Sequence, residues 1–287
     1  MSLLKKLFAR KAAFQFFWHG GCLPPLAWLS LSSFVNRRHR VHLYAYEALI
    51  APREVQQEPA NRVVDPKRLF YINDSYAQFS DLFRCELLLK RGGWWIDTDV
   101  LCMTESISEN DIVFAEEENG FINGAIVKFP KNHPAMKTLR LEIDKIKIEE
   151  CGWDDMGPNL LTRVLKTVQL DGHALPRTYF YPLDYAEAYK FILPEFYDEI
   201  TDRIKSSACV HFWNYMYHLF GFDIVKSRPP SGSFLDVQFS SLDIYQHYES
   251  QEIDERKLRN RINEYIGQPS VCNRAKELGF QVSPLRI

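Results

Sequence analysis

One segment of the chain, residues 80–102, constrains the fold most strongly. Its first part, up to Lys90, is rich in good helix formers and contains neither glycine nor proline, so it predicts a helix. Gly92 and Gly93 end that helix, because glycine readily takes the left-handed backbone conformation that follows a helix C-terminus. The bulky residues 94–96 predict a short buried strand. The segment therefore predicts a helix, a tight turn and a buried strand in direct succession.

The predicted strand runs directly into Asp97-Thr98-Asp99. Acidic residues are rare inside strands, so two carboxylates one residue apart indicate a strand end that opens onto a site. Such carboxylates repel each other unless a cation or a proton lies between them. Oxygen ligands suit Mg²⁺ or Mn²⁺ bound to a phosphate-bearing substrate. The alternative is that both residues only cap the next turn.

The predicted helix before these aspartates carries two opposite charges on a largely apolar surface. Asp81 and Arg84 lie on one face of it, at i,i+3 spacing. A buried charge requires a partner. Two interpretations follow: the residues form an internal ion pair, or both side chains project towards the site at the end of the next strand.

The rest of the chain predicts an alternation of strands and helices. A strand at 14–18, a helix at 25–36 and a strand at 41–46 make a β-α-β unit, which places its two strands parallel. Loops are expected at 51–66 and at the acidic run 116–118. Further strands are expected at 69–72, 112–115, 123–129 and 208–213, and further helices at 135–148, 158–165 and 252–265.

Taken together, Ser80-Asp81-x-x-Arg84, Gly92-Gly93 and Ile96-Asp97-Thr98-Asp99 resemble the sugar-binding region of the DxD glycosyltransferases. The pattern is similar to that of glycosyltransferase family 32, which includes capsule and lipopolysaccharide sugar transferases. The resemblance is strongest over 75–102 and weaker over 14–46, 123–134 and 157–165. It implies a GT-A-type α/β fold, with a mostly parallel central sheet flanked by helices and a helical C-terminal extension.

The same resemblance implies an activity. The chain would be a metal-dependent, retaining glycosyltransferase that moves a hexose from a UDP- or GDP-sugar to a glycan, a lipid-linked glycan or a protein. Mn²⁺ or Mg²⁺ would be held by Asp97, Asp99 and His211. Family members carry Ser-Trp shortly after this histidine, whereas this chain has Met216-Tyr217.

Further residue roles follow from the resemblance. The catalytic residues would be Asp81, Arg84 and Asp97. The donor would be bound by Trp18, Gly20, Gly21, Asp81, Arg84, Asp97 and Asn123. The acceptor side would be formed by Asp155, Gly157 and Pro158.

The composition of the chain bears on the kind of protein it is and on the cellular compartment in which it works. A net charge of -2 over 287 residues gives no support for a nucleic-acid binder. The six cysteines are scattered without a C-x-x-C pair, which argues against a zinc site and a disulfide scaffold and suits reduced thiols in a cytosol. No apolar run is long enough to span a membrane. We therefore expect a cytoplasmic enzyme, placed at the inner face of the membrane.

The chain is expected to have three parts: a basic N-terminal segment, 1–12, a transferase domain, 13–240, and a helical extension, 241–287. The basic segment is either an amphipathic helix that rests on a membrane surface or a frayed polar terminus. Two other functions stay open. The Asp-x-Asp also resembles the first motif of haloacid-dehalogenase-type phosphatases, and the chain can be a non-catalytic sugar-nucleotide-binding module. The sequence does not distinguish the sugar, the nucleotide base or the acceptor.

Overall fold

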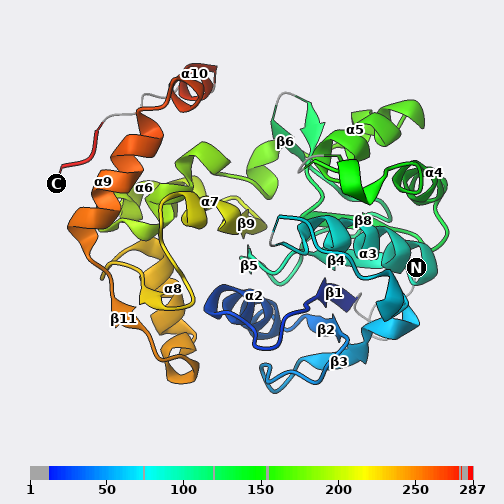
Figure 1. The fold of residues 1–287 in the computed structure, drawn as a ribbon, viewed down its shortest axis with the longest axis horizontal. Helices are drawn as coiled ribbons and strands as arrows, with labels where there is room; N and C mark the ends of the chain where they lie inside the picture. Colours follow the sequence, from blue (N-terminus) through cyan, green and yellow to red (C-terminus); the bar gives the residue numbers. More distant parts are fainter. Residues whose placement is uncertain are drawn as a thin grey trace, which may run out of the picture. The chain divides into compact units, whose positions relative to one another are not determined.

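The computed structural model describes residues 13–73, 75–118, 120–152, 155–277, 279 and 284–286 (Figure 1). The predicted basic segment 1–12 lies outside these residues. The chain divides into two compact units and passes between them several times, once between Thr98 and Asp99. The first unit comprises Met1–Leu23, Phe34–Thr98 and Thr104–Arg177, and the second comprises Pro24–Ser33, Asp99–Met103 and Thr178–Ile287. The predicted boundary at residue 240 stays a prediction.

The first unit is built on a five-stranded sheet in the order β3-β2-β1-β4-β8. Strands β1, β2, β3 and β4 are parallel to their neighbours, and only β8 is antiparallel, against β4. The predicted α/β fold with a mostly parallel sheet is thereby confirmed. The strands are β1 (Ala13–Phe17), β2 (Arg40–Ala45), β3 (Gln56–Pro59), β4 (Gly93–Ile96) and β8 (Ile126–Phe129).

Side chains that alternate along these strands give the sheet two apolar faces. Phe17 and Trp95 point to one face, where they share a core with residues of α3, α4 and α5. Phe14 points to the other face and contacts Trp94 and Phe34. The helices of this unit are α3 (Ala77–Lys90), α4 (Pro134–Ile143) and α5 (Pro158–Thr167), and Figure 1 shows α3 and α4 beside β4 and β8. The helix α2 (Pro25–Asn36) begins in the second unit and ends in the first.

The turn between α3 and β4 depends on glycine, as predicted. Gly92 has φ +67° and Gly93 has φ +93°. Gly92 also lies so close to the backbone of Lys131 that a Cβ atom at this position would overlap it. The turn aims β4 into the sheet directly after α3, and so fixes where the aspartates that follow β4 emerge.

Four local predictions were wrong. The expected loop 51–66 contains the edge strand β3, whose exposed polar residues carry no apolar alternation. The expected strand 69–72 makes only an isolated bridge between Ile72 and Ser75. The expected strand 112–115 likewise makes isolated bridges, and the acidic run after it is the hairpin strand β6 (Glu116–Glu118), paired with β7 (Phe121–Ile122). In each case, backbone pairing with another segment determined whether the residues form a strand, and local composition does not encode that pairing.

Two further elements are shorter than predicted. The helix expected over 135–148 is α4, which ends at Ile143 and is followed by a 3-10 turn, Ile148–Glu150. The strand expected over 123–129 begins only at Ile126. His133 precedes α4 and caps it, because its Nδ1 accepts a hydrogen bond from the amide of Ala135 at 3.2 Å.

The second unit is mainly helical. Its antiparallel pair β5 (Val100–Cys102) and β9 (Cys209–His211) joins two segments that are more than a hundred residues apart in the sequence. The helix predicted over 252–265 is present as α9 (Glu255–Ile266), and a further helix, α10 (Pro269–Glu277), follows it. The remaining elements are the long 3-10 helix η6 (Tyr185–Ile192), α6 (Tyr197–Arg203), α7 (Asn214–Leu219), α8 (Phe234–Ser241) and the short pair β10 (Ser227–Arg228) and β11 (Gln251–Glu252).

Among the described residues, every helix falls short of the length and apolar character needed to cross a bilayer.

Candidate active site

The candidate residues of the first unit gather at one edge of its sheet. The carboxyl ends of the parallel strands β1, β2 and β4 share this edge, and the antiparallel strand β8 begins there, with Ile126 opposite Ile96. Trp18 follows β1, and Asp97 follows β4. In open α/β sheets, ligands bind outside the carboxyl ends of the strands. The register therefore places the predicted donor residues where such a sheet binds its ligand.

Asp97 is held in place by three groups. Its amide donates to the carbonyl oxygen of Ala125 at 2.8 Å, which extends the β4–β8 ladder by one bond. The indole Nε1 of Trp95 donates to Asp97 Oδ1 at 2.6 Å. Arg84 Nη1 lies 3.9 Å from the same oxygen. The Asp97 side chain remains one-third exposed, so its carboxylate is positioned and still open to a ligand.

Arg84 lies between two aspartates of the first unit, Asp81 and Asp97. Its guanidinium is buried and forms a 2.5 Å hydrogen bond and ion pair with Asp81 Oδ1 in the same helix. Burial lowers the pKa of Arg84, but the charges of Asp81 and Asp97 outweigh that effect and raise it. Both interpretations of the helix are therefore partly right: Asp81 and Arg84 pair with each other, and Arg84 also faces the aspartate that follows β4.

Gly124 makes room for this guanidinium. A Cβ atom at residue 124 would lie 2.5 Å from Cζ of Arg84. Next to it, Asn123 Oδ1 accepts from the amide of Ala125 at 2.7 Å, and Asn123 Nδ2 donates to Glu117 Oε2 at 2.7 Å. Asn123 thus orders the turn that packs against Arg84.

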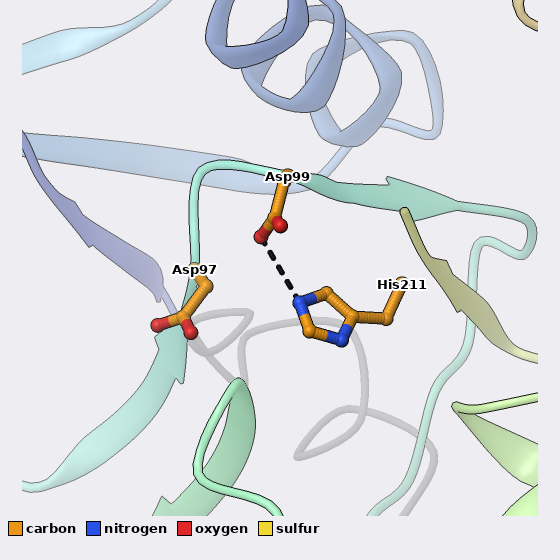
Figure 2. A group of neighbouring side chains, drawn as sticks. All are labelled: Asp97, Asp99 and His211. Atoms are coloured by element: carbon orange, nitrogen blue, oxygen red, sulfur yellow. Dashed lines mark hydrogen bonds and ion pairs between the residues drawn. The ribbon is translucent and has the colours of Figure 1, made fainter. Parts of the chain in front are cut away.

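Asp99 and His211 meet in the second unit, and Figure 2 shows their side chains together with that of Asp97. His211 Nε2 lies 3.2 Å from Asp99 Oδ1, and the amide of Asn214 donates to Asp99 Oδ2 at 2.9 Å. The pairing of β5 with β9 brings these residues together. Burial raises the pKa of Asp99, but the charge and hydrogen bond of His211 and the Asn214 amide lower it by more, so Asp99 is ionised near neutral pH.

These side chains have the chemistry of a divalent-cation site. Asp97, Asp99 and His211 each offer one ligand atom, and because only Thr98 separates the two aspartates, their Cα atoms lie at most about 7 Å apart. The side-chain oxygen of Asn214 is buried without a hydrogen-bond partner among the residues that the structure describes. Two carboxylates and one imidazole fit Mn²⁺ well, since Mg²⁺ favours oxygen ligands alone.

A residue that sequence analysis missed, Glu47, lies at the end of β2. Its Oε1 accepts from the amides of Gly20 and Gly21 at 3.0 and 3.1 Å, and its Oε2 lies 3.1 Å from His19 Nδ1. Burial raises the pKa of Glu47, but these hydrogen bonds lower it below its usual value. An acidic residue directly after a predicted parallel strand was the available signal. The amides of Gly20 and Gly21, the predicted donor-binding glycines, are therefore already hydrogen-bonded to the Glu47 carboxylate.

The predicted acceptor-side residues lie at the start of α5. Gly157 precedes the helix and Pro158 is its first residue, as predicted. Thr162, one turn later, accepts a hydrogen bond from the amide of Ile122 at 2.8 Å, which places α5 beside the strand that leads to Asn123. Asp155 Oδ2 accepts from the amide of Gly152 at 2.7 Å and so closes a local turn.

Two family models match adjoining parts of the chain. A model described as a capsular polysaccharide synthesis protein matches residues 65–133, and one described as an alpha 1,4-glycosyltransferase conserved region matches residues 145–229. The first stretch contains Asp81, Arg84, Asp97 and Asp99. The second contains Gly157, Pro158 and His211, and it extends well beyond residues 157–165, the last segment over which the sequence resemblance was stated.

Individual relatives agree with these models. The lactosylceramide 4-alpha-galactosyltransferase of Mus musculus is 29% identical over 146 residues, which are 47% of this chain and 40% of that protein. The chain thus spans less than half the length of this curated relative.

Two solved structures are also similar. The PaToxG glycosyltransferase has a TM-score of 0.44 and 15% identity, and the match covers 55% of this chain and 69% of that one. The glycosyltransferase GlyE of Streptococcus pneumoniae TIGR4 has a TM-score of 0.41 and 9% identity, with 96% and 66% covered.

The two matched segments and the Asp97–Asp99 pair support a GT-A-like glycosyltransferase. The proteins that the chain matches are glycosyltransferases, and these findings therefore indicate an enzyme. The phosphatase and the non-catalytic module are not favoured.

Proposed function

We propose that the chain transfers a hexose from a nucleotide-sugar donor to a hydroxyl group of a glycan, a lipid-linked glycan or a protein, in a metal-dependent reaction. One observation carries the proposal. Two acidic residues separated only by Thr98 are fixed by different partners: Asp97 by Trp95 and Arg84, and Asp99 by His211. This arrangement holds two carboxylates ready for a cation and a diphosphate.

The metal would be held by Asp99, with Asp97 and His211 as further ligands, and Mn²⁺ is the ion that this ligand set favours. When bound, it supplies positive charge that stabilises the departing nucleoside diphosphate. The protein contributes by keeping Asp99 ionised through His211 and the Asn214 amide. It also keeps both aspartates on a short, fixed segment between β4 and β5.

The donor sugar and diphosphate would be held by Asp81, Arg84, Asp97 and Asn123. A guanidinium suits oxygen anions because its planar donors match them in pairs. Burial and the Asp81 pair preorganise Arg84, so little conformational entropy is lost when the donor binds. The nucleoside would lie near Trp18, Gly20 and Gly21. Glu47 repels phosphate there, so this end of the donor site suits the uncharged part of the nucleotide.

The acceptor would approach from the start of α5, beside Asp155, Gly157 and Pro158. A helix N-terminus offers backbone amides that bind hydroxyl oxygens. Ile122, which directly precedes Asn123, donates its amide to Thr162 of α5 and so connects this region to the donor side. We further propose that the transferred sugar retains its anomeric configuration. We also propose that transfer takes place at the cytoplasmic face of a membrane, with residues 1–12 in contact with the membrane surface. The anomeric signal of the product in an NMR spectrum tests retention.

The proposal is tested by calorimetric titration of the protein with UDP, GDP and their sugars, in Mn²⁺ and in EDTA. We expect one nucleotide to bind in a metal-dependent manner, and Asp99→Ala to remove that dependence. Asp202→Ala is the matched control, because Asp202 is exposed in the same unit and pairs locally with Lys205. Folded wild-type protein that binds none of these compounds would refute the proposal.

A further inference from the structure

Two of the six cysteines lie opposite each other in the second unit. Cys102 is the last residue of β5, and Cys209 is the first residue of β9. The antiparallel register pairs Cys102 with Cys209, just as it pairs Val100 with His211. The spacing of the cysteines in the sequence does not indicate this contact, because more than a hundred residues separate the two strands.

The hydrogen bonds of the ladder identify the kind of pair that the cysteines form. The amide of Phe212 donates to Asp99 O and the amide of Met103 donates to Ala208 O, both at 2.9 Å. Hydrogen-bonded and non-hydrogen-bonded pairs alternate along an antiparallel ladder, so Cys102 and Cys209 form a non-hydrogen-bonded pair. In such a pair the Cα atoms lie about 4.5 Å apart, at the short end of the range of about 4.4–6.8 Å that disulfides span.

The side chains are in contact and are shielded from solvent. The two thiols form a hydrogen bond with each other, and Cys102 and Cys209 are 2% and 0% exposed. Burial raises the pKa of Cys209, and the hydrogen bond and charge of Cys102 raise it further. Because both thiols are enclosed in the folded protein, oxidation is expected while the chain folds, before they are shielded from solvent.

We propose that Cys102 and Cys209 are an oxidisable dithiol that closes to a disulfide bond across β5 and β9. The oxidant is a low-molecular-weight disulfide. One cysteine thiolate attacks it, forms a mixed disulfide and releases one small thiolate. The other cysteine thiolate then attacks the protein sulfur of the mixed disulfide and releases the second small thiolate. The protein loses two electrons and two protons, and the small disulfide is reduced to two thiols.

The bond would join the two strands that carry Asp99 and His211. Asp99 directly precedes β5, and His211 ends β9. A covalent link two residues from His211 would keep these strands paired when the surrounding helices loosen. It would also close a loop of about 100 residues, which strongly restricts the unfolded chain. The dithiol is independent of the proposed transferase activity, because its formation and its effect on stability are both measured without substrate.

The experiment is refolding of the reduced protein in a buffer of glutathione and glutathione disulfide, followed by alkylation, digestion and mass spectrometry. We expect a folded monomer that has lost two hydrogens, with one crosslink joining the peptides that contain Cys102 and Cys209. Its melting temperature should exceed that of the reduced protein by on the order of 10 °C. Cys102→Ala and Cys209→Ala should each abolish the crosslink and this difference.

Cys85→Ala is the matched control, since Cys85 is equally buried but contacts the backbone of Met136 in the first unit. It should keep the 102–209 crosslink. Folded wild-type protein that retains six free thiols in the oxidising buffer would overturn the proposal, and so would crosslinks that join other cysteines or two chains. The wild-type peptide map decides the question even if an alanine variant fails to fold.

Discussion

Glu187 is a buried charged residue whose removal should strongly destabilise the second unit. Its side chain is 1% exposed and lies in the 3-10 helix η6. Arg203 binds it through Nη1 at 2.5 Å and Nη2 at 2.8 Å, and Lys190 Nζ lies 3.0 Å away. Burial raises the pKa of Glu187, but these two cations lower it to about 2, from an ordinary value of 4.5.

The shift sets the size of the effect. A difference of one pKa unit between folded and unfolded chain corresponds to about 1.4 kcal/mol, so ionised Glu187 contributes about 3 kcal/mol to the free energy of unfolding at pH 7. Because the folded pKa is the lower one, this contribution is complete above pH 4.5 and is lost as the pH falls towards 2. At pH 3 we expect about 1 kcal/mol to remain.

The test is urea unfolding of wild type and Glu187→Gln from pH 7 down to pH 3. The variant should be less stable by about 3 kcal/mol at pH 7, and the difference should shrink as the pH falls. Glu199→Gln is the control, because Glu199 pairs with the same Lys190 and Arg203 but is 41% exposed. It should cost at most about 1 kcal/mol. Equal losses for both variants, or a loss for Glu187→Gln that does not change with pH, would refute this reasoning.

Three more predictions concern the candidate site. Arg84→Ala should weaken binding of the nucleotide sugar more than binding of the free nucleotide, because the guanidinium faces Asp97; equal losses in calorimetry would place its role elsewhere. Gly124→Ala should reproduce that selective loss, since a methyl group there displaces Arg84, and should destabilise the protein by about 1–3 kcal/mol. Gly172→Ala, where a Cβ atom meets nothing within 4 Å, is its control and should bind normally. Removal of metal with EDTA should reduce nucleotide affinity in wild type and leave Asp99→Ala unaffected; a response of both proteins would assign the metal to another site.

The sequence by itself determined the local elements around the site. Helix formers up to Lys90, two glycines at positive φ and a run of bulky residues specify α3, its turn and β4 through short-range sterics and burial. The position of Asp97 and Asp99 at a strand end follows from the same segment. Weakly apolar segments such as Gln56–Pro59 were mispredicted, because their strand character comes from a neighbouring strand and not from their own residues.

Only the tertiary structure decided which distant residues meet. It paired β5 with β9, and so placed His211 against Asp99 and Cys209 against Cys102. It also seated Glu47 on the amides of Gly20 and Gly21. Hydrogen bonding between strands and the burial of charge beside countercharge act between segments far apart in the chain. For that reason the composition of each segment predicts its secondary structure, while the partners of its side chains are fixed only when the sheet and the helices assemble.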